Sequence, residues 1–161
     1  MINLLGTSAI FLDIDGVLNQ YNHHERKRRH KIHKASGFKE ELDTFNPAKK
    51  KIQQLSAIVK RYNVDVYVFS AWSSERLQPF LPFTLKGDTI KRMTNVIELM
   101  TQYKQNILIE DEYKTELFGK DRLPLPKGLT LMKINGDFGM VKKDYTKLNR
   151  LLKGVKWKTC T

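Results

Sequence analysis

The chain alternates between short apolar runs and stretches in which apolar residues recur at helical spacing. Residues 8–14 form the first apolar run, which contains Asp13 and is followed at once by Asp15. Three later runs have the same character: VDVYVFSAWSS, NILIEDE and LTLMKIN. Continuous apolar runs of this length are typical of strands that are buried on both faces of a parallel sheet. We therefore predict four strands, and a short fifth strand in VKWKT.

Three stretches between these runs are predicted to be helices. The first begins at Asn46, a good capping residue, with Pro47 in its first turn. The second begins at Asp88 and continues through Tyr103. The third begins near Val141, and Gly154 is its expected terminator.

Strands that alternate with helices predict an α/β fold, a Rossmann-like three-layer sandwich with a mainly parallel sheet. We expect residues 1–161 to form a single domain in which residues 19–45, which have no apolar periodicity, are a polar, basic insertion after the first strand. Ligands of such sheets bind at the carboxyl ends of the strands, so we expect the functional site at that edge.

The formal net charge of the chain is +12, and the positive residues are unevenly distributed. Residues 23–34 contain six Lys or Arg, one Glu and four His, which gives this segment a formal charge of +5. Such an excess favours a polyanionic partner. No run of 18 apolar residues occurs, so we expect no membrane span. A single cysteine, Cys160, suits a cytoplasmic protein.

Carboxylates gather where two predicted strands end. Asp13 and Asp15 end the first strand, and Glu110 and Asp111 end the third. Their charges repel one another at the edge of an apolar core, and a bound cation would relieve that repulsion. Mg²⁺ prefers oxygen ligands of this kind. The pattern predicts a Mg²⁺ site for an anionic substrate, and a solvated acidic loop cluster is the alternative.

The motif FLDIDGVLN, residues 11–19, resembles the first motif of the haloacid dehalogenase (HAD) superfamily phosphatases. VYVFSAWS and ILIEDE resemble the second and fourth motifs, in the same order along the chain. The stretches FNP and SAW also resemble the small HAD domains of RNA-repair proteins. The chain departs from that narrower pattern at Ser73, where those domains usually carry Arg, and at Glu110, where they usually carry Asp.

This resemblance implies a mechanism. Asp13 would attack phosphorus to form an aspartyl-phosphate, and Asp15 would act as general acid and then as general base. Ser70 would hydrogen-bond a phosphoryl oxygen, and Gly16 would permit the turn that brings backbone N–H groups to the phosphate. The Mg²⁺ ligands would be Asp13, Asp15, Glu110 and Asp111. Which of the last two binds the metal directly stays open.

The resemblance also implies one Lys or Arg that binds the phosphate. Lys91, Lys86 and Lys104 are the candidates. We favour Lys91, because it falls with Arg92 in the first turn of the helix predicted to follow Asp88. Two cations there oppose the helix dipole, an arrangement that makes more sense if an anion binds.

The basic insertion lies where the family can carry a substrate-selecting cap, although it is too short for a full cap domain. We predict substrate contacts from Arg26, Lys27, Arg28 and Arg29. Trp72 is a further candidate, by stacking on a base, and its alternative role is core packing. For the insertion itself, a solvated charged surface and a zinc site at its four histidines are the alternatives, and the histidine spacing matches no familiar zinc pattern.

Taken together, the sequence predicts a Mg²⁺-dependent phosphomonoesterase that acts on a nucleic acid terminal phosphate or on a nucleotide. One alternative is a catalytically silent HAD module that binds nucleic acid, and the intact pair of Asp13 and Asp15 argues against it. A phosphatase acting on protein or sugar phosphates is the other alternative. The oligomeric state is left open.

Overall fold

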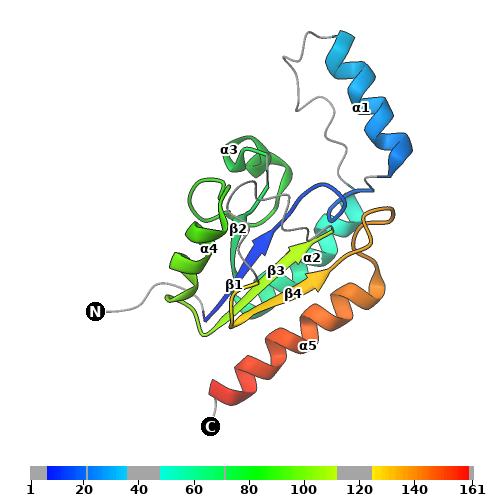
Figure 1. The fold of residues 1–161 in the computed structure, drawn as a ribbon. Coiled ribbons are helices and arrows are strands. Elements are labelled where there is room, and N and C mark those ends of the chain that lie inside the picture. The colour runs from blue at the N-terminus through cyan, green and yellow to red at the C-terminus, as the bar shows by residue number, and fades with distance from the viewer. Residues whose placement is uncertain (1–6, 21, 36–47, 71, 112–124, 160–161) are drawn as a thin grey trace.

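A parallel sheet of four strands, in the order β2-β1-β3-β4, is the centre of the computed structural model, which describes residues 7–20, 22–35, 48–70, 72–111 and 125–159 (Figure 1). The side chains of His33 and of residues 155–159 are not described. The strands are β1 (Ser8–Leu12), β2 (Asp65–Val68), β3 (Gln105–Glu110) and β4 (Leu129–Lys133). All pairs are parallel, so the carboxyl ends of the strands share one edge.

Helices cover both faces of this sheet (Figure 1). The helical elements are α1 (His23–Ala35), α2 (Lys49–Tyr62), α3 (Ser74–Leu77), the 3-10 helix η2 (Gln78–Phe80), α4 (Met93–Met100) and α5 (Lys142–Thr159). Alternate residues of β1 point to opposite faces. Ile10 packs in one cluster with Leu55 of α2 and Leu148 of α5, and Phe11 packs in the other with Met93 of α4. The α/β three-layer prediction is confirmed.

The start of α2 differs from the prediction in detail. The helix begins at Lys49 and Ala48 holds the capping position, without a side-chain hydrogen bond. The predicted cap, Asn46, and the following Pro47 lie outside the described residues. The helix ends at Tyr62, and the following residue, Asn63, adopts the left-handed conformation that closes many helices.

Helix α4 begins later than the sequence predicts. Asp88 does not cap it, because residues 85–90 run beside β2 and form two parallel bridges, one with Val66 of β2 and one with Phe69 directly after it. The capping position of α4 belongs to Arg92, and the first helical residue is Met93. Lys91 and Arg92 therefore precede the helix, and the prediction that they occupy its first turn is wrong.

The C-terminal helix is longer than predicted. Helix α5 continues through Gly154, so this glycine is not its terminator, and VKWKT belongs to the helix rather than to a fifth strand. A glycine in a helix interior costs only about 1 kcal/mol relative to alanine. The packing of Leu148 and Leu152, 0% and 2% exposed, holds α5 against the sheet through this point.

Part of the basic insertion is helical. Helix α1 lies beyond the carboxyl ends of the strands, at the upper right of Figure 1. The apolar residues of α1 show no periodicity, and local polar contacts stabilise the helix. The Asn22 side chain accepts a hydrogen bond from the backbone N–H of Glu25, and Arg28 pairs with Glu25. Among the described helices, none combines the length and the apolar character that crossing a membrane requires.

Candidate active site

Three carboxylates meet at the carboxyl edge of the sheet. Asp13 directly follows β1, and its backbone N–H donates to the carbonyl of Ile109 at 2.9 Å, which extends the pairing of β1 with β3 by one residue. Glu110 ends β3 and Asp111 follows it. Each of the three side chains offers a carboxylate oxygen within 4.8 Å of the others. The sequence prediction that acids from two strands converge holds for these three residues.

The electrostatics of this acidic cluster, Asp13, Glu110 and Asp111, favour a cation. Glu110 and Asp111 are 5% and 9% exposed. Burial raises the pKa of Asp13 well above its ordinary value, and the hydrogen bond with Glu110 and the charges of both neighbours raise this pKa further. Hard oxygen donors that repel one another in this way suit a divalent cation such as Mg²⁺. The residues present therefore fit the metal that the sequence predicts.

Two glycines make room for Asp111. Gly16 has a φ of +78°, and a Cβ on this residue would overlap the Asp111 carboxylate. A Cβ on Gly136, in the loop after β4, would lie 2.6 Å from Oδ2 of Asp111. The turn predicted at Gly16 is present, and its backbone N–H donates to Oδ1 of Asn19 at 2.9 Å. The glycine thus serves the placement of Asp111 as well as the turn.

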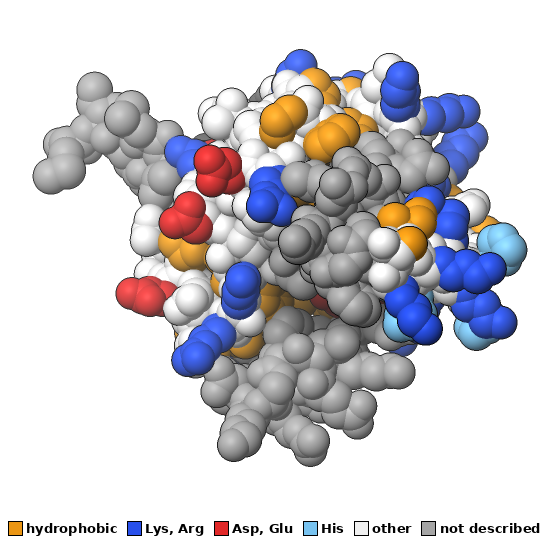
Figure 2. Space-filling view, turned by 90° about the horizontal axis from the view of Figure 1, so that it is seen from above, with side chains coloured by type: hydrophobic (Ala, Val, Ile, Leu, Met, Phe, Trp, Pro, Cys, Tyr) orange, Lys and Arg blue, Asp and Glu red, His pale blue; other side chains and the backbone are white. Residues whose placement is uncertain are grey.

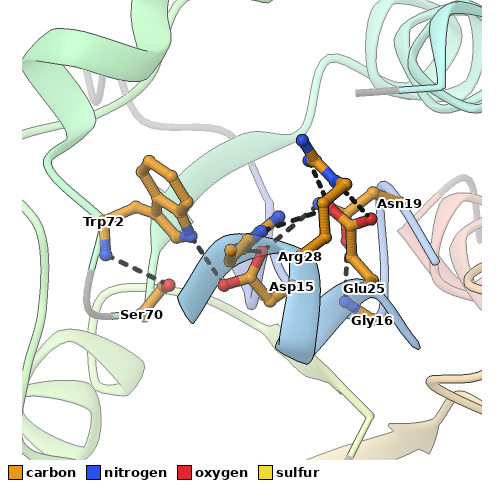
Figure 3. Close-up of polar contacts among 8 residues, drawn as sticks. Asp15, Gly16, Asn19, Glu25, Arg28, Ser70 and Trp72 are labelled. Carbon is orange, nitrogen blue, oxygen red and sulfur yellow. Dashed lines mark hydrogen bonds and ion pairs between the residues drawn. The ribbon is translucent and has the colours of Figure 1, made fainter. Parts of the chain in front are cut away.

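Asp15 is oriented by donors from three parts of the chain (Figure 3). Its Oδ2 accepts a hydrogen bond from the indole N–H of Trp72 at 2.9 Å. Its Oδ1 accepts from Nη1 of Arg29 at 2.7 Å and from the Asn19 amide at 3.3 Å. The side chain of Asp15 is outside the acidic cluster of Asp13. The two carboxylates of the first motif therefore have different surroundings.

Arg29 differs from the other cations of α1. Its side chain is 7% exposed, and its guanidinium lies 5.5 Å from the centre of the Trp72 ring. Glu25, one turn earlier on α1, approaches Nε of Arg29 at 3.4 Å and also pairs with Arg28. Arg29 thus ties the helix to Asp15, a positioning role that the sequence did not separate from that of Arg26, Lys27 and Arg28.

The opposite face of α1 is exposed and basic. Figure 2 shows the histidine and cationic side chains of this region gathered on one side of the molecule, away from the acidic side chains visible in that view. The exposed His, Lys and Arg residues are His23, His24, Arg26, Lys27, His30, Lys31 and Lys34. At 100° per residue, all of them except Arg26 lie 100° or more around the helix from Arg29. We call this surface the outer face of α1.

The predicted phosphate ligands lie on and beside the segment after β2. Ser70 accepts a hydrogen bond from the backbone N–H of Trp72 at 3.2 Å. Trp72 itself is 8% exposed, within the core cluster, and its contact with substrate stays a prediction. Lys91 is exposed and follows Ile90, which forms a bridge with Phe69 directly before Ser70.

The other two candidate lysines lie farther from Ser70. The backbone N–H of Lys86 donates to the carbonyl of Val66, four residues before Ser70. That of Lys104 donates to the carbonyl of Thr7, at the amino end of the sheet. The backbone geometry therefore favours Lys91 on position, although not for the helix-dipole reason that the sequence suggested.

Three further residues contact the site residues and were not predicted from the sequence: Asn19, Gly136 and Glu25. Asn19 is 3% exposed and bridges Gly16 and Asp15. It ends the quoted motif FLDIDGVLN, so its position was a usable signal. Nothing in the sequence relates Gly136 to Asp111, because their proximity depends on the pairing of β3 with β4. The sequence did not identify Glu25 as the partner of Arg28 and Arg29, because Glu25 lies within a run of positive residues.

Comparison with protein families identifies a matching family. The model of the family described as "HAD domain in Swiss Army Knife RNA repair proteins" matches residues 9–107. The match includes the turn after β1, all of α1 and α2, and the segment that contains Ser70 and Lys91, and it ends just before Glu110 and Asp111. No curated protein and no solved structure matches the chain.

Measurements of unfolding free energy can test the two roles of Gly16, which are to form the turn and to leave space for Asp111. We expect Gly87→Ala, at a positive φ with open space around it, to lower the free energy of unfolding by about 1–2 kcal/mol. We expect Gly16→Ala to cost at least about 1 kcal/mol more, because its Cβ also displaces the buried Asp111. Urea denaturation of both variants measures the difference. Equal losses would contradict the close approach of Gly16 to Asp111.

The tether between α1 and the site can be tested by amide hydrogen exchange. A hydrogen bond between charged groups contributes about 1.5–3 kcal/mol, and an isolated helix of this length is marginal in water. We therefore expect Arg29→Gln to speed amide exchange in α1 by about tenfold or more. Lys27→Gln, on the outer face, is the matched control and should leave this exchange unaltered. Equal protection in the two variants would show that Arg29 does not hold the helix.

Proposed function

Since the chain belongs to the family of HAD domains in Swiss Army Knife RNA repair proteins, we propose that it is a Mg²⁺-dependent phosphomonoesterase that removes a terminal phosphate from a nucleic acid or from a nucleotide. The observation that carries the proposal is the acidic cluster of Asp13, Glu110 and Asp111 beside the oriented Asp15. In this proposal residues 1–161 act as one phosphatase domain, and residues 19–45 are its cap-like insertion.

The reaction has two displacements. An oxygen of Asp13 attacks phosphorus, the bond from phosphorus to the ester oxygen breaks, and the leaving oxygen takes a proton from Asp15. Asp15 then removes a proton from water, the water oxygen attacks phosphorus, and the bond between phosphorus and Asp13 breaks. Inorganic phosphate leaves and both carboxyl groups return to their starting state. The hydrogen bonds that Asp15 accepts from Trp72, Arg29 and Asn19 fix the orientation of its carboxylate, which supports the step in which it removes a proton from water.

Mg²⁺ would be held by Asp13 with Glu110 or Asp111, and it would neutralise negative charge between the phosphoryl group and the carboxylates. The raised pKa of Asp13 supports this assignment. Without compensating charge, burial and two acidic neighbours favour the protonated carboxyl, which is a poor nucleophile. Asp13 can therefore act as the nucleophile only when a cation compensates the negative charge of the acidic cluster.

Ser70 and Lys91 would bind the phosphoryl oxygens. The Ser70 hydroxyl accepts the hydrogen bond from Trp72, so its own proton is the one it can donate to substrate. Lys91 is exposed and directly follows the segment that runs beside β2, and in this proposal its side chain extends toward an anion held next to Ser70. Gly16 contributes the turn, and its N–H is directed to Asn19 in this structure.

The division of α1 into two faces supports a nucleic acid substrate. Arg29 holds the helix at Asp15, while the outer face presents its positive charge away from that contact. A nucleotide offers few phosphates to such a surface, whereas a nucleic acid strand offers several. We therefore propose that the outer face binds phosphates next to the end being processed.

The nucleophile assignment predicts the effect of one substitution. Asp13→Asn should lower hydrolysis of p-nitrophenyl phosphate and of a 3′-phosphorylated RNA oligonucleotide by about 1,000-fold or more. Asp88→Asn, at an exposed acid outside the cluster, is the matched control and should retain activity. Removal of divalent metal by EDTA should abolish turnover by the unaltered protein, and added Mg²⁺ should restore it. Full activity of Asp13→Asn would refute the mechanism.

The role of the outer face predicts a salt dependence. Replacement of Lys27, Lys31 and Lys34 by Gln should lower kcat/KM for a phosphorylated oligonucleotide. It should also make the slope of log kcat/KM against log salt concentration less steep by up to about two. The matched control replaces three exposed lysines at the amino end of the sheet, Lys60, Lys104 and Lys127. If both triple variants respond to salt like the unaltered protein, the outer face does not bind the substrate.

A further inference from the structure

Helix α5 carries a second basic surface, separate from α1. Its exposed residues Lys142, Lys143, Thr146, Lys147 and Arg150 line a shallow depression of about 620 Å³. These positions recur every three or four residues, so they form one stripe along the helix. We call them the α5 stripe.

The positive charge of this stripe has no acidic counterpart within α5. Asp144 is the only acid in the helix. It is 7% exposed, and its carboxylate accepts a hydrogen bond from the backbone N–H of Val141 at 2.8 Å. It therefore closes the start of the helix and is not exposed beside the four cations. A surface that keeps four like charges together favours a polyanion.

The stripe starts beside the candidate active site. The backbone N–H of Met140, two residues before α5, donates to the carbonyl of Val17 in the turn after β1 at 2.8 Å. Nζ of Lys51 donates to the carbonyl of Met140 at 2.6 Å and fixes this junction. From there α5 runs back along the outside of the sheet, away from the carboxyl edge (Figure 1). A chain whose end lies at Asp13 can therefore continue along α5.

The length of the stripe matches several phosphates. Residues 142 to 150 span about 12 Å of helix axis. A stacked strand with the rise of a duplex carries a phosphate about every 3.4 Å along its axis, so the stripe spans about three phosphates of such a strand.

We infer that the α5 stripe binds the sugar-phosphate backbone of the nucleic acid strand whose terminal phosphate is removed, several nucleotides away from that end. This inference rests on the proposed function and adds a second contact region to it. With this second contact the domain distinguishes substrates by length, because a strand that reaches both Asp13 and the stripe binds more tightly than one that reaches Asp13 alone. A mononucleotide is too short to reach it.

A length series tests the inference. RNA oligonucleotides of 2, 4, 8 and 12 nucleotides with a 3′-phosphate serve as substrates, and kcat/KM is measured for each. We expect kcat/KM to rise by about tenfold or more between the shortest and the longest, and to rise by less than about threefold in the triple variant of Lys143, Lys147 and Arg150 to Gln. The control triple variant of Lys60, Lys104 and Lys127 to Gln should keep the full rise. An equal length dependence in both variants would overturn the inference.

A binding measurement keeps the test independent of turnover. Fluorescence anisotropy of a labelled 12-nucleotide RNA gives its Kd at several salt concentrations for the same proteins. We expect the stripe variant to flatten the slope of log Kd against log salt by about two, because single strands give about 0.7 per phosphate contact. Unaltered binding in the stripe variant, or equal competition by polyglutamate of the same charge, would overturn the inference.

The outcomes separate the two proposals. If neither p-nitrophenyl phosphate nor any oligonucleotide is hydrolysed, the proposed function fails, and the anisotropy experiment still decides whether the stripe binds RNA. If hydrolysis occurs with the same kcat/KM at every length, the proposed function stands and the inference that the α5 stripe binds the strand is wrong.

Discussion

The mutual repulsion of three carboxylates at the end of β1 and β3 is the constraint on which the rest of the structure depends. The pairing of β1 with β3 brings Asp13 next to Glu110 and Asp111, and burial raises the pKa of Asp13 in consequence. The protein accommodates this arrangement with glycines at positions 16 and 136, where any side chain would displace Asp111. A cation bound at this cluster would relieve the repulsion, and in the proposed mechanism it would also prepare Asp13 to attack phosphorus.

The second carboxylate of the motif, Asp15, is kept apart from this cluster by its hydrogen bonds. Trp72 comes from the segment after β2 and Arg29 from α1, so Asp15 connects the sheet edge to the basic insertion. The residue assigned to proton transfer is therefore also the point at which α1 is attached. In the proposed function, a strand bound to α1 would therefore act on the same helix that orients Asp15.

Much of this could be predicted from the sequence because buried parallel strands leave continuous apolar runs, and the acids after them mark the carboxyl edge. The family assignment and the α/β fold followed from the same residues. The pattern could not give the start of α4, since residues 85–90 pair with β2 through backbone bonds that leave no side-chain signal. Nor could it separate Arg29 from its basic neighbours, because burial of one cation depends on the tertiary position of Asp15. Gly154 was misread because the packing of α5 outweighs a local preference.

Metal binding by the acidic cluster tests the central claim most directly. Isothermal titration calorimetry with Mg²⁺ should show one site in the unaltered protein. Asp13→Asn should weaken this site by at least about tenfold, while Asp88→Asn, an exposed acid elsewhere, should bind Mg²⁺ like the unaltered protein. Absence of Mg²⁺ binding, or the same affinity in Asp13→Asn as in the unaltered protein, would contradict the account.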